Sequence, residues 1–446
     1  MLNGFVEHFR RLLGRAAPGT APAAPPERAE ADYRRVDEVN FTCIFANRLA
    51  NLAVSDATLS VSGRGGAARG ARAELVARAL EDVFSRAHRI TTQVLGTGGR
   101  VLVPYVAGDE VRCDVVSQDR MFVTGAEGGR VTRAVILADA AQEGGRTYFR
   151  WADYALEDGV QRVRRRITDA QGRPVPPELV PAWADVPEEV AIAGVRRLTL
   201  AHLRCPVDDR REQDVYGVPI TYGCEALIDE IHEHMRVIRR EYRLTRPMLG
   251  LSAEMWRAPF SGEGEAGIER ARRSVQDADE PFIPVEAGFG EAGAPWMIYA
   301  PDIRSQAMHE RLEHLFDLLE RAVGTSRGIL TARETTAATA TEIRAANRDT
   351  FALVGAVRRM WERGIAELAE AVDVLCEHYA LSPAGQRGAY CARVEWDMSL
   401  LESSEETFHQ LAELESRGAL SKAELRRWVL GGTLEEAERA TRPREA

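Results

Sequence analysis

The sequence predicts an α+β protein in which long helices accompany a region of short antiparallel strands. Two observations support this prediction of the fold class. Over 303–323 and 339–380, apolar residues recur at steps of three and four, the spacing of one helical face. Between 100 and 167 the apolar spacing changes to two, and turn residues separate the runs. That second pattern is typical of an antiparallel meander.

Length and charge limit the classes of function. The 446 residues suffice for roughly three ordinary domains. Hydrophobic residues make up 45% and charged residues 28%, so a packed core is expected throughout. The formal net charge of −10 argues against a protein that coats nucleic acid, because such a protein needs a basic face.

The cysteines and the hydropathy pattern predict an intracellular, soluble protein. The six cysteines are scattered and none forms a C-x-x-C pair, so we expect buried free thiols in a reducing compartment. Residues 1–15 lack the order of a signal peptide, and no apolar run has the length of a membrane helix.

The first half of the chain divides into an arm, two helical segments and a set of strands. Residues 1–30 predict a short amphipathic helix and an Ala/Pro-rich arm, and 31–60 and 72–90 predict helices. Residues 169–192 predict a polar excursion. The predicted strands lie at 100–106, 111–116, 121–123, 131–136, 147–151, 160–167 and 195–203.

The next segment predicts a helix with opposite charges at its two ends, followed by a compact insert. Acidic residues fill the first half of the helix over 222–246, and this order complements the helix dipole. The basic residues of its second half include Arg236, Arg239, Arg240 and Arg243. Residues 247–300 predict short strands around a small helix at 266–275. The aromatic residues Trp256, Phe282 and Trp296 form either the core of this insert or a contact surface.

The second half is dominated by two helices joined by a polar loop. The helix over 303–323 carries an apolar face at Met308, Leu312, Leu315, Leu319 and Ala322. A capping box at Thr339 and Glu342 starts a helix that should end near Pro383 and span roughly 60 Å. Its predicted face holds Val354, Val357, Trp361, Ile365, Leu368, Val372, Leu375 and Tyr379. A strand at 391–396 and short helices at 406–415, 422–429 and 434–440 should follow.

Motifs that carry catalysis are missing from this pattern. The glycine-rich run 96–99 does not have the G-x-G-x-x-G form and predicts a turn. His309 and His314 lie five residues apart, so they diverge on a helix and do not form a zinc pair. The one lysine, Lys422, does not belong to a phosphate-binding loop. We expect no enzyme, no metal site and no cofactor.

Three short stretches resemble portal proteins of tailed bacteriophages, of the long-tailed siphophage type. Residues 300–304 (APDIR) are similar to that family's P-x-I-R motif, and 339–343 (TATEI) to its T-A-T-E-V motif. Residues 417–421 (RGALS) with 435–437 (EEA) are similar to its C-terminal pattern. The resemblance spans about residues 30–440. Family members often carry a lysine before the threonine motif, where this chain has Ala338.

The resemblance implies a portal fold with named parts. An N-terminal helix and arm, 1–30, precedes an α/β wing, 31–220. Two stem helices, 221–246 and 301–323, flank a small α/β clip. The remaining parts are the clip at 247–300, a tunnel loop at 324–338, a long wing helix at 339–390 and a C-terminal crown at 391–446.

The resemblance also implies a function and partners. The family forms a homo-oligomeric ring, usually of twelve subunits, at the capsid vertex of the virion, and assembles in the cytoplasm of the bacterial host. Double-stranded DNA passes through the head-to-tail connector without sequence readout during packaging and ejection. The implied protein partners are the terminase large subunit, a head completion or adaptor protein, and the major capsid and scaffold proteins, with no membrane. An alternative is another structural minor head protein of a phage-like particle or gene-transfer agent.

Carried onto this chain, the resemblance implies site residues. In the tunnel loop, Arg327 and Arg333 would touch the DNA backbone, with Thr335 and Thr336 as polar neighbours; intersubunit salt bridges are the alternative for both arginines. In the clip, Trp256, Phe282 and Trp296 would contact a partner or form the core. An acidic subunit repeated around a ring would repel phosphates and let DNA slide.

Overall fold

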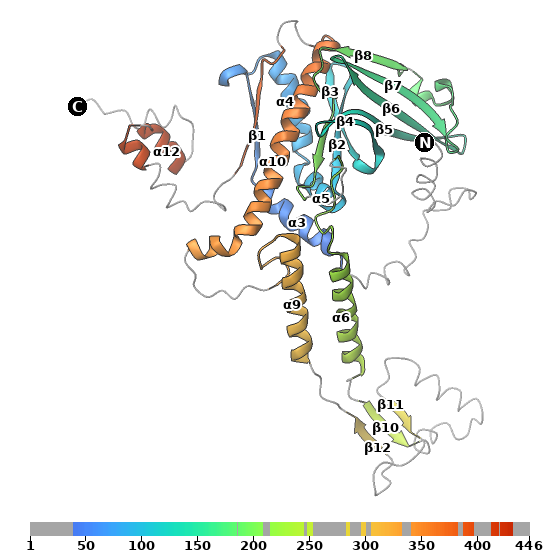
Figure 1. Cartoon of the computed structure of the whole chain (residues 1–446), viewed down its shortest axis with the longest axis vertical. Helices are drawn as coiled ribbons and strands as arrows, with labels where there is room; N and C mark the ends of the chain where they lie inside the picture. Colours follow the sequence, from blue (N-terminus) through green and yellow to red (C-terminus); the bar gives the residue numbers. More distant parts are fainter. Residues whose placement is uncertain are drawn as a thin grey trace. The chain divides into compact units, whose positions relative to one another are not determined.

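The structure is a computed structural model that divides into two compact units (Figure 1). One unit is made of residues up to Tyr222 and from Val323 onward, and the other of residues Gly223–Ala322, so the second is an insertion in the first. Helices and strands both contribute, which confirms the α+β class. The structure describes residues 39–184, 186–207, 215–244, 248–252, 282–285, 296–299, 305–331, 340–381, 387–396, 412–418 and 420–430.

The first unit contains five of the described helices. Asn40 starts the first of them, because its side chain accepts a hydrogen bond of 2.9 Å from the Cys43 backbone N–H. At the last one, Ser421 and Glu424 cap each other's backbone N–H groups. These helices are α3 (Phe41–Val54), α4 (Ala71–Phe84), α5 (Ala87–Thr97), α10 (Ala340–His378) and α12 (Lys422–Leu430).

Helix α10 is the central element of the first unit. Its 39 residues span about 58 Å, which confirms the long helix expected from the sequence. It lies against α3, α4 and strand β9 (Ala201–Arg204). Trp361 is fully buried there, and its indole N–H donates to the Thr91 hydroxyl at 2.7 Å. The predicted apolar face is buried from Val354 to Leu375, whereas Tyr379 is exposed.

The strands between residues 99 and 204 form two separate antiparallel sheets. In the larger one, five strands follow one another in chain order, as the meander prediction required. They are β4 (Met121–Glu127), β5 (Arg130–Glu143), β6 (Arg146–Glu157), β7 (Val160–Asp169) and β8 (Glu189–Ala193). The smaller sheet has the order β3–β2–β9, with β2 at Gly99–Ala107 and β3 at Glu110–Ser117.

The strand predicted at 195–203 is wrong over most of its length. Only β9 at its end is a strand, and β8 lies within the predicted excursion 169–192. Buried Gln161 gives the reason, because its side chain replaces a strand partner. Its amide donates to the Thr199 hydroxyl at 2.7 Å, and its carbonyl accepts from the Thr199 backbone N–H at 2.6 Å.

Two helix predictions need correction as well. The segment 72–90 contains two helices, α4 and α5, separated by a break at Ser85 and Arg86. The predicted helix 31–60 is described only from residue 39; it ends at Val54, and residues 58–62 form a strand. That strand, β1 (Thr58–Ser62), pairs antiparallel with β13 (Cys391–Glu395). The β13 strand was predicted, but its partner was not.

Within its described residues, the inserted unit contains helices α6 (Glu225–Leu244) and α9 (Ser305–Val323) and a small sheet. The two helices confirm the two predicted ones. Polar contacts join them, including a 2.9 Å ion pair between Glu230 and Arg311. Within the predicted face of α9, Leu315 and Leu319 are buried while Ala322 is exposed. The sheet has the order β11–β10–β12, with β10 at Met248–Ser252, β11 at Phe282–Val285 and β12 at Trp296–Tyr299.

The expected free thiols are confirmed, with two exceptions to their expected burial. All six cysteines are unpaired, and Cys113, Cys205, Cys224 and Cys376 are buried, but Cys43 is exposed and Cys391 is half-buried. Within the described part of the chain, no helix combines the length and apolar character that a bilayer crossing requires. The predicted helices at 1–15, 266–275 and 434–440 lie outside the described residues.

Candidate functional site

The residues predicted to line a DNA channel are only partly described. Arg327 is exposed and follows a short anchored segment, where the Ser326 backbone N–H donates to the Thr350 hydroxyl of α10 at 2.8 Å. Arg333, Thr335 and Thr336 lie outside the described residues. Only one of the four residues is described, so the role of this set stays a prediction.

Two of the three predicted contact aromatics of the insert, Phe282 and Trp296, lie in one small sheet. Phe282 on β11 pairs with Leu249 of β10, and Trp296 on β12 pairs with Leu251 of the same strand. Trp256 lies outside the described residues. The choice between a core role and a contact role for these residues stays open.

The predicted basic end of α6 is present in the second half of this helix. Arg236 forms an ion pair of 2.7 Å with Glu233, one turn earlier on the same helix. Arg239 and Arg240 are exposed, and Arg243 lies in the last turn. This arrangement fits the helix dipole argument and does not by itself form a site.

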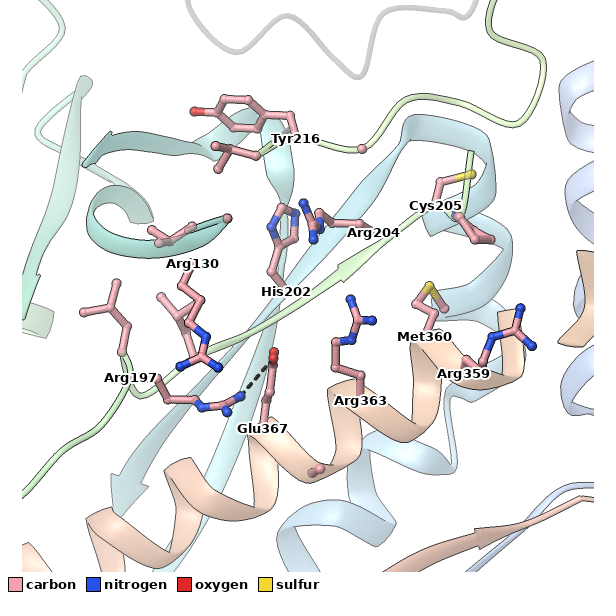
Figure 2. A pocket seen from close by; sticks show the side chains of 18 of the residues that line it. Arg130, Arg197, His202, Arg204, Cys205, Tyr216, Arg359, Met360, Arg363 and Glu367 are labelled. Carbon is pink, nitrogen blue, oxygen red and sulfur yellow. Dashed lines mark ion pairs between the residues drawn. The ribbon is translucent and has the colours of Figure 1, made fainter. Parts of the chain in front are cut away.

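A pocket of about 780 Å³ lies in the first unit, beside α10 and β9 (Figure 2). Its walls come from the β4–β5 turn, the segment before β9, β9 itself, the segment around Tyr216 and one face of α10. The lining residues are Gly129, Arg130, Val131, Arg197, Leu198, Leu200, His202, Arg204, Cys205, Pro206, Val207, Val215, Tyr216, Gly217, Ala356, Arg359, Met360, Arg363, Ala366 and Glu367.

The lining of this pocket is strongly basic. Five of its residues are arginines and one, Glu367, is acidic, so the pocket carries an excess of four positive charges. This excess stands out in a chain whose net charge is −10. Figure 2 shows Arg363 rising from α10 toward His202 and Arg204, with Arg130 reaching in from the opposite side.

Arg197 and Glu367 fix one wall of the pocket through ion pairs. Arg197 contacts Glu367 at 2.9 Å through Nη1 and Glu370 at 3.1 Å through Nε. Burial raises the pKa of Glu367, while Arg197, Arg363 and the backbone N–H of His202 oppose that rise. Arg197 is thereby neutralised by two carboxylates of α10.

His202 contributes a neutral ring to the pocket. Burial, assisted by the nearby charge of Arg204, lowers the pKa of His202 to about 3. Its Nε2 lies 3.3 Å from the Gln118 side-chain oxygen. The positive charge of the pocket at neutral pH therefore comes from the arginines alone.

A close approach of two glycines supports the wall beside His202. The Gln118 amide donates to the Gly217 carbonyl at 2.7 Å and accepts from the Gly217 N–H at 3.1 Å. A Cβ on Gly217 would lie 2.1 Å from the Gly98 oxygen, so only glycine fits. Gly98 itself has φ 97° and ends α5. The turn predicted over 96–99 is confined to Gly98, because Gly96 and Thr97 still belong to α5 and Gly99 begins β2.

The sequence analysis did not find this pocket. Its arginines come from separate parts of the chain, and no local spacing links them. The one signal was the pair Arg359 and Arg363, four residues apart and therefore on one face of α10. The same spacing is equally typical of a helix face that is exposed to solvent.

The arginines of this pocket make it suitable for binding an anion. Guanidinium groups donate paired hydrogen bonds to phosphate and carboxylate oxygens and stay charged at any physiological pH. Among the described residues, no group of His, Cys, Asp and Glu has a metal-binding arrangement. No protein-family model matches the chain, and no curated protein matches it.

Proposed function

We propose that this chain is the subunit of a ring-shaped portal through which double-stranded DNA enters and leaves a phage-like capsid. The observation that carries the proposal is the order of elements. A unit with a β-meander is interrupted by two helices that flank a small sheet, and it resumes with a 39-residue helix. This order agrees with the wing, stem, clip and long helix of the family that the sequence resembles.

The inserted helices carry apolar side chains that a ring would cover. Val237 and Tyr242 of α6 are 42% and 43% exposed, and Leu318 of α9 is 38% exposed. An interface with another chain would remove these apolar side chains from water. In a closed ring each subunit meets its neighbour through two different surfaces, so these helices would pack between neighbouring copies.

The net charge of the chain suits a passage for DNA. A ring of acidic subunits repels phosphates, and few arginines are needed to touch the backbone in passing. The terminase large subunit, the adaptor protein and the capsid and scaffold proteins remain the partners that the proposal implies.

Electron microscopy of negatively stained protein, with mass photometry of the same sample, tests the proposal. The expected result is rings with a central hole and a mass near 590 kDa, twelve times the 49.3 kDa of one chain. A stable compact dimer without a hole, at any protein concentration and with scaffold protein added, would contradict it.

A matched pair of substitutions tests the helix pair as the ring interface. Leu318→Glu places a charge on the proposed interface and should prevent ring closure while leaving a folded monomer. Leu179→Glu is the control, because Leu179 is 56% exposed and lies in the first unit. Rings formed equally well by both variants would place the interface elsewhere.

A further inference from the structure

The basic pocket beside α10 contains arginines that form no ion pair with a described carboxylate at 4 Å or less. Among the described ion pairs, Arg197 is matched by Glu367 and Glu370, and none of them involves Arg130 or Arg363. Arg359, one turn before Arg363 on the same face of α10, is also outside these pairs. Elsewhere in the described chain, exposed arginines commonly pair with a nearby carboxylate, as Arg86 does with Asp82 at 2.7 Å.

The backbone presents Arg130 to the pocket in a defined position. Gly128 and Gly129 have φ values of 55° and 75°, and Glu127 pairs with Arg130 across the turn. Two central residues with positive φ form the tight turn that joins antiparallel strands. Arg130 is therefore the first residue of a rigid strand, opposite the helical Arg363 (Figure 2).

The rest of the lining is apolar and aromatic. Leu198 and Leu200 are buried, and Met360 adds a flexible apolar side chain from α10. The hydroxyl of Tyr216 accepts from the Val123 backbone N–H at 2.8 Å and lies 3.2 Å from the Met121 carbonyl oxygen, so its position is fixed. The pocket thus offers a fixed ring and an apolar wall next to the guanidinium groups.

We propose that this pocket binds a small polyphosphate anion, with Arg130 and Arg363 as its principal ligands and Arg359 as a further arginine of the lining. The volume of about 780 Å³ lies within the range of roughly 300–1,000 Å³ that small-molecule sites occupy. A di- or triphosphate concentrates several negative charges within one pocket. Its terminal oxygens match the paired donors of a guanidinium group.

Charge and size favour this ligand over the alternatives. A single carboxylate would leave most of the charge of Arg130, Arg359 and Arg363 unmatched. A DNA duplex spreads its charge along its length, about one charge per 1.7 Å of axis, and can reach only the mouth of a concave site. Inorganic polyphosphate and nucleoside polyphosphates share the required chemistry, and the apolar wall beside Tyr216 gives the nucleoside a place to bind.

Isothermal titration calorimetry of the full-length chain tests the proposal with two ligands, inorganic tripolyphosphate and ATP. At 50 mM salt we expect both to bind, with a Kd below about 100 µM, and to bind more weakly at 300 mM salt because exposed charges are screened. Tighter binding of ATP would identify a nucleoside ligand, and equal binding would identify inorganic polyphosphate. Absence of binding by both would overturn the proposal.

Charge reversals locate the site. Arg363→Glu and Arg130→Glu should each weaken binding at least about tenfold. Arg64→Glu is the matched control, because Arg64 is exposed, stands outside the described ion pairs and does not line the pocket. If Arg64→Glu weakened binding as much as the pocket variants did, the effect would be a general one of net charge, and the proposal would fail.

Two further measurements keep the outcome unambiguous. Arg130 lies at an exposed turn, so Arg130→Glu tests the site even if Arg363→Glu fails to fold. The melting temperature of each variant shows whether that variant is folded.

A fluorescently labelled DNA duplex is the competitor. A duplex that binds the pocket arginines and is not displaced by tripolyphosphate would overturn the proposal in favour of a nucleic-acid surface. The proposal does not rest on ring formation, since a monomer carries the whole pocket.

Discussion

At the scale of single residues, a buried ion pair links α4 to α10. Arg72 and Asp373 have side-chain exposures of 1% and 5%, and their Nε and Oδ1 atoms lie 3.3 Å apart without hydrogen-bond geometry. Arg72 also donates to the Asp373 backbone oxygen at 3.2 Å, and Asp373 accepts from the Gly388 N–H at 2.9 Å. Burial raises the pKa of Asp373 even though these partners lower it. The interactions of the Asp373 carboxylate therefore do not fully offset the cost of removing its charge from water.

This pair predicts a strong difference between single and double substitutions. Asp373→Leu alone should lower the free energy of unfolding by about 3–5 kcal/mol, because it leaves the Arg72 charge buried without a partner. Combining it with Arg72→Met should recover at least about 2 kcal/mol, since apolar side chains of similar volume replace the pair. Urea unfolding of both variants measures this. A double variant no more stable than Asp373→Leu would show that the unpaired Arg72 charge is not the cause of the loss.

At the scale of elements, two glycines of α10 differ in what surrounds them. A Cβ on Gly364 would lie 2.2 Å from the Cδ2 atom of Leu203, which is fully buried in β9. A Cβ on Gly355 would meet only the end of the Arg359 side chain, at 3.5 Å. Gly364 therefore allows α10 to approach β9 closely, and Gly355 has no such role.

Alanine at these two positions should change stability in opposite directions. Gly355→Ala should raise the free energy of unfolding by about 0.5–1 kcal/mol, because alanine has the higher helix propensity. Gly364→Ala should lower it by about 1–3 kcal/mol, because the methyl group overpacks the contact with Leu203. Thermal unfolding compares the two variants. Stabilisation by both would mean that Leu203 moves aside at little cost.

Elements that depend on local spacing could be predicted from the sequence, and elements that depend on distant partners could not. The face of α10 was predictable because a helical face depends only on local spacing, and seven of its eight named residues are buried. The strand at 195–203 was predicted wrongly because the buried Gln161 side chain, distant in sequence, satisfies the backbone of Thr199. The pairing of β1 with β13 and the basic pocket were not predictable, since both join segments that share no local pattern.

At the scale of the whole molecule, the insertion should be separable from the unit that contains it. The first unit has its own core, including the cluster around Ile136 and Tyr154 and the buried face of α10. Replacing residues 223–322 by a flexible Gly/Ser linker of about 15 residues, which spans roughly 20 Å, should therefore leave a folded protein. Circular dichroism and cooperative urea unfolding measure this. Loss of cooperative unfolding would show that the first unit needs the insertion.

The same deletion separates the two proposals at this scale. It removes the helix pair, so a portal subunit without it should no longer close into rings. It leaves every residue that lines the pocket, so tripolyphosphate should still bind. A deletion variant that still formed rings would contradict the assignment of the interface to the helix pair.

The pairing of β1 with β13 also affects how the chain folds during its synthesis. During synthesis, β1 leaves the ribosome more than 300 residues before its partner strand does. Synthesis proceeds at about 5–20 residues per second. For roughly 15 to 70 s, β1 therefore has no partner strand, and the surfaces of α3 and α4 that α10 covers stay exposed. A nascent chain in that interval exposes an unpaired strand edge and apolar helix faces. The cell must therefore protect the growing first unit, and the speed of translation affects how much of the protein escapes aggregation.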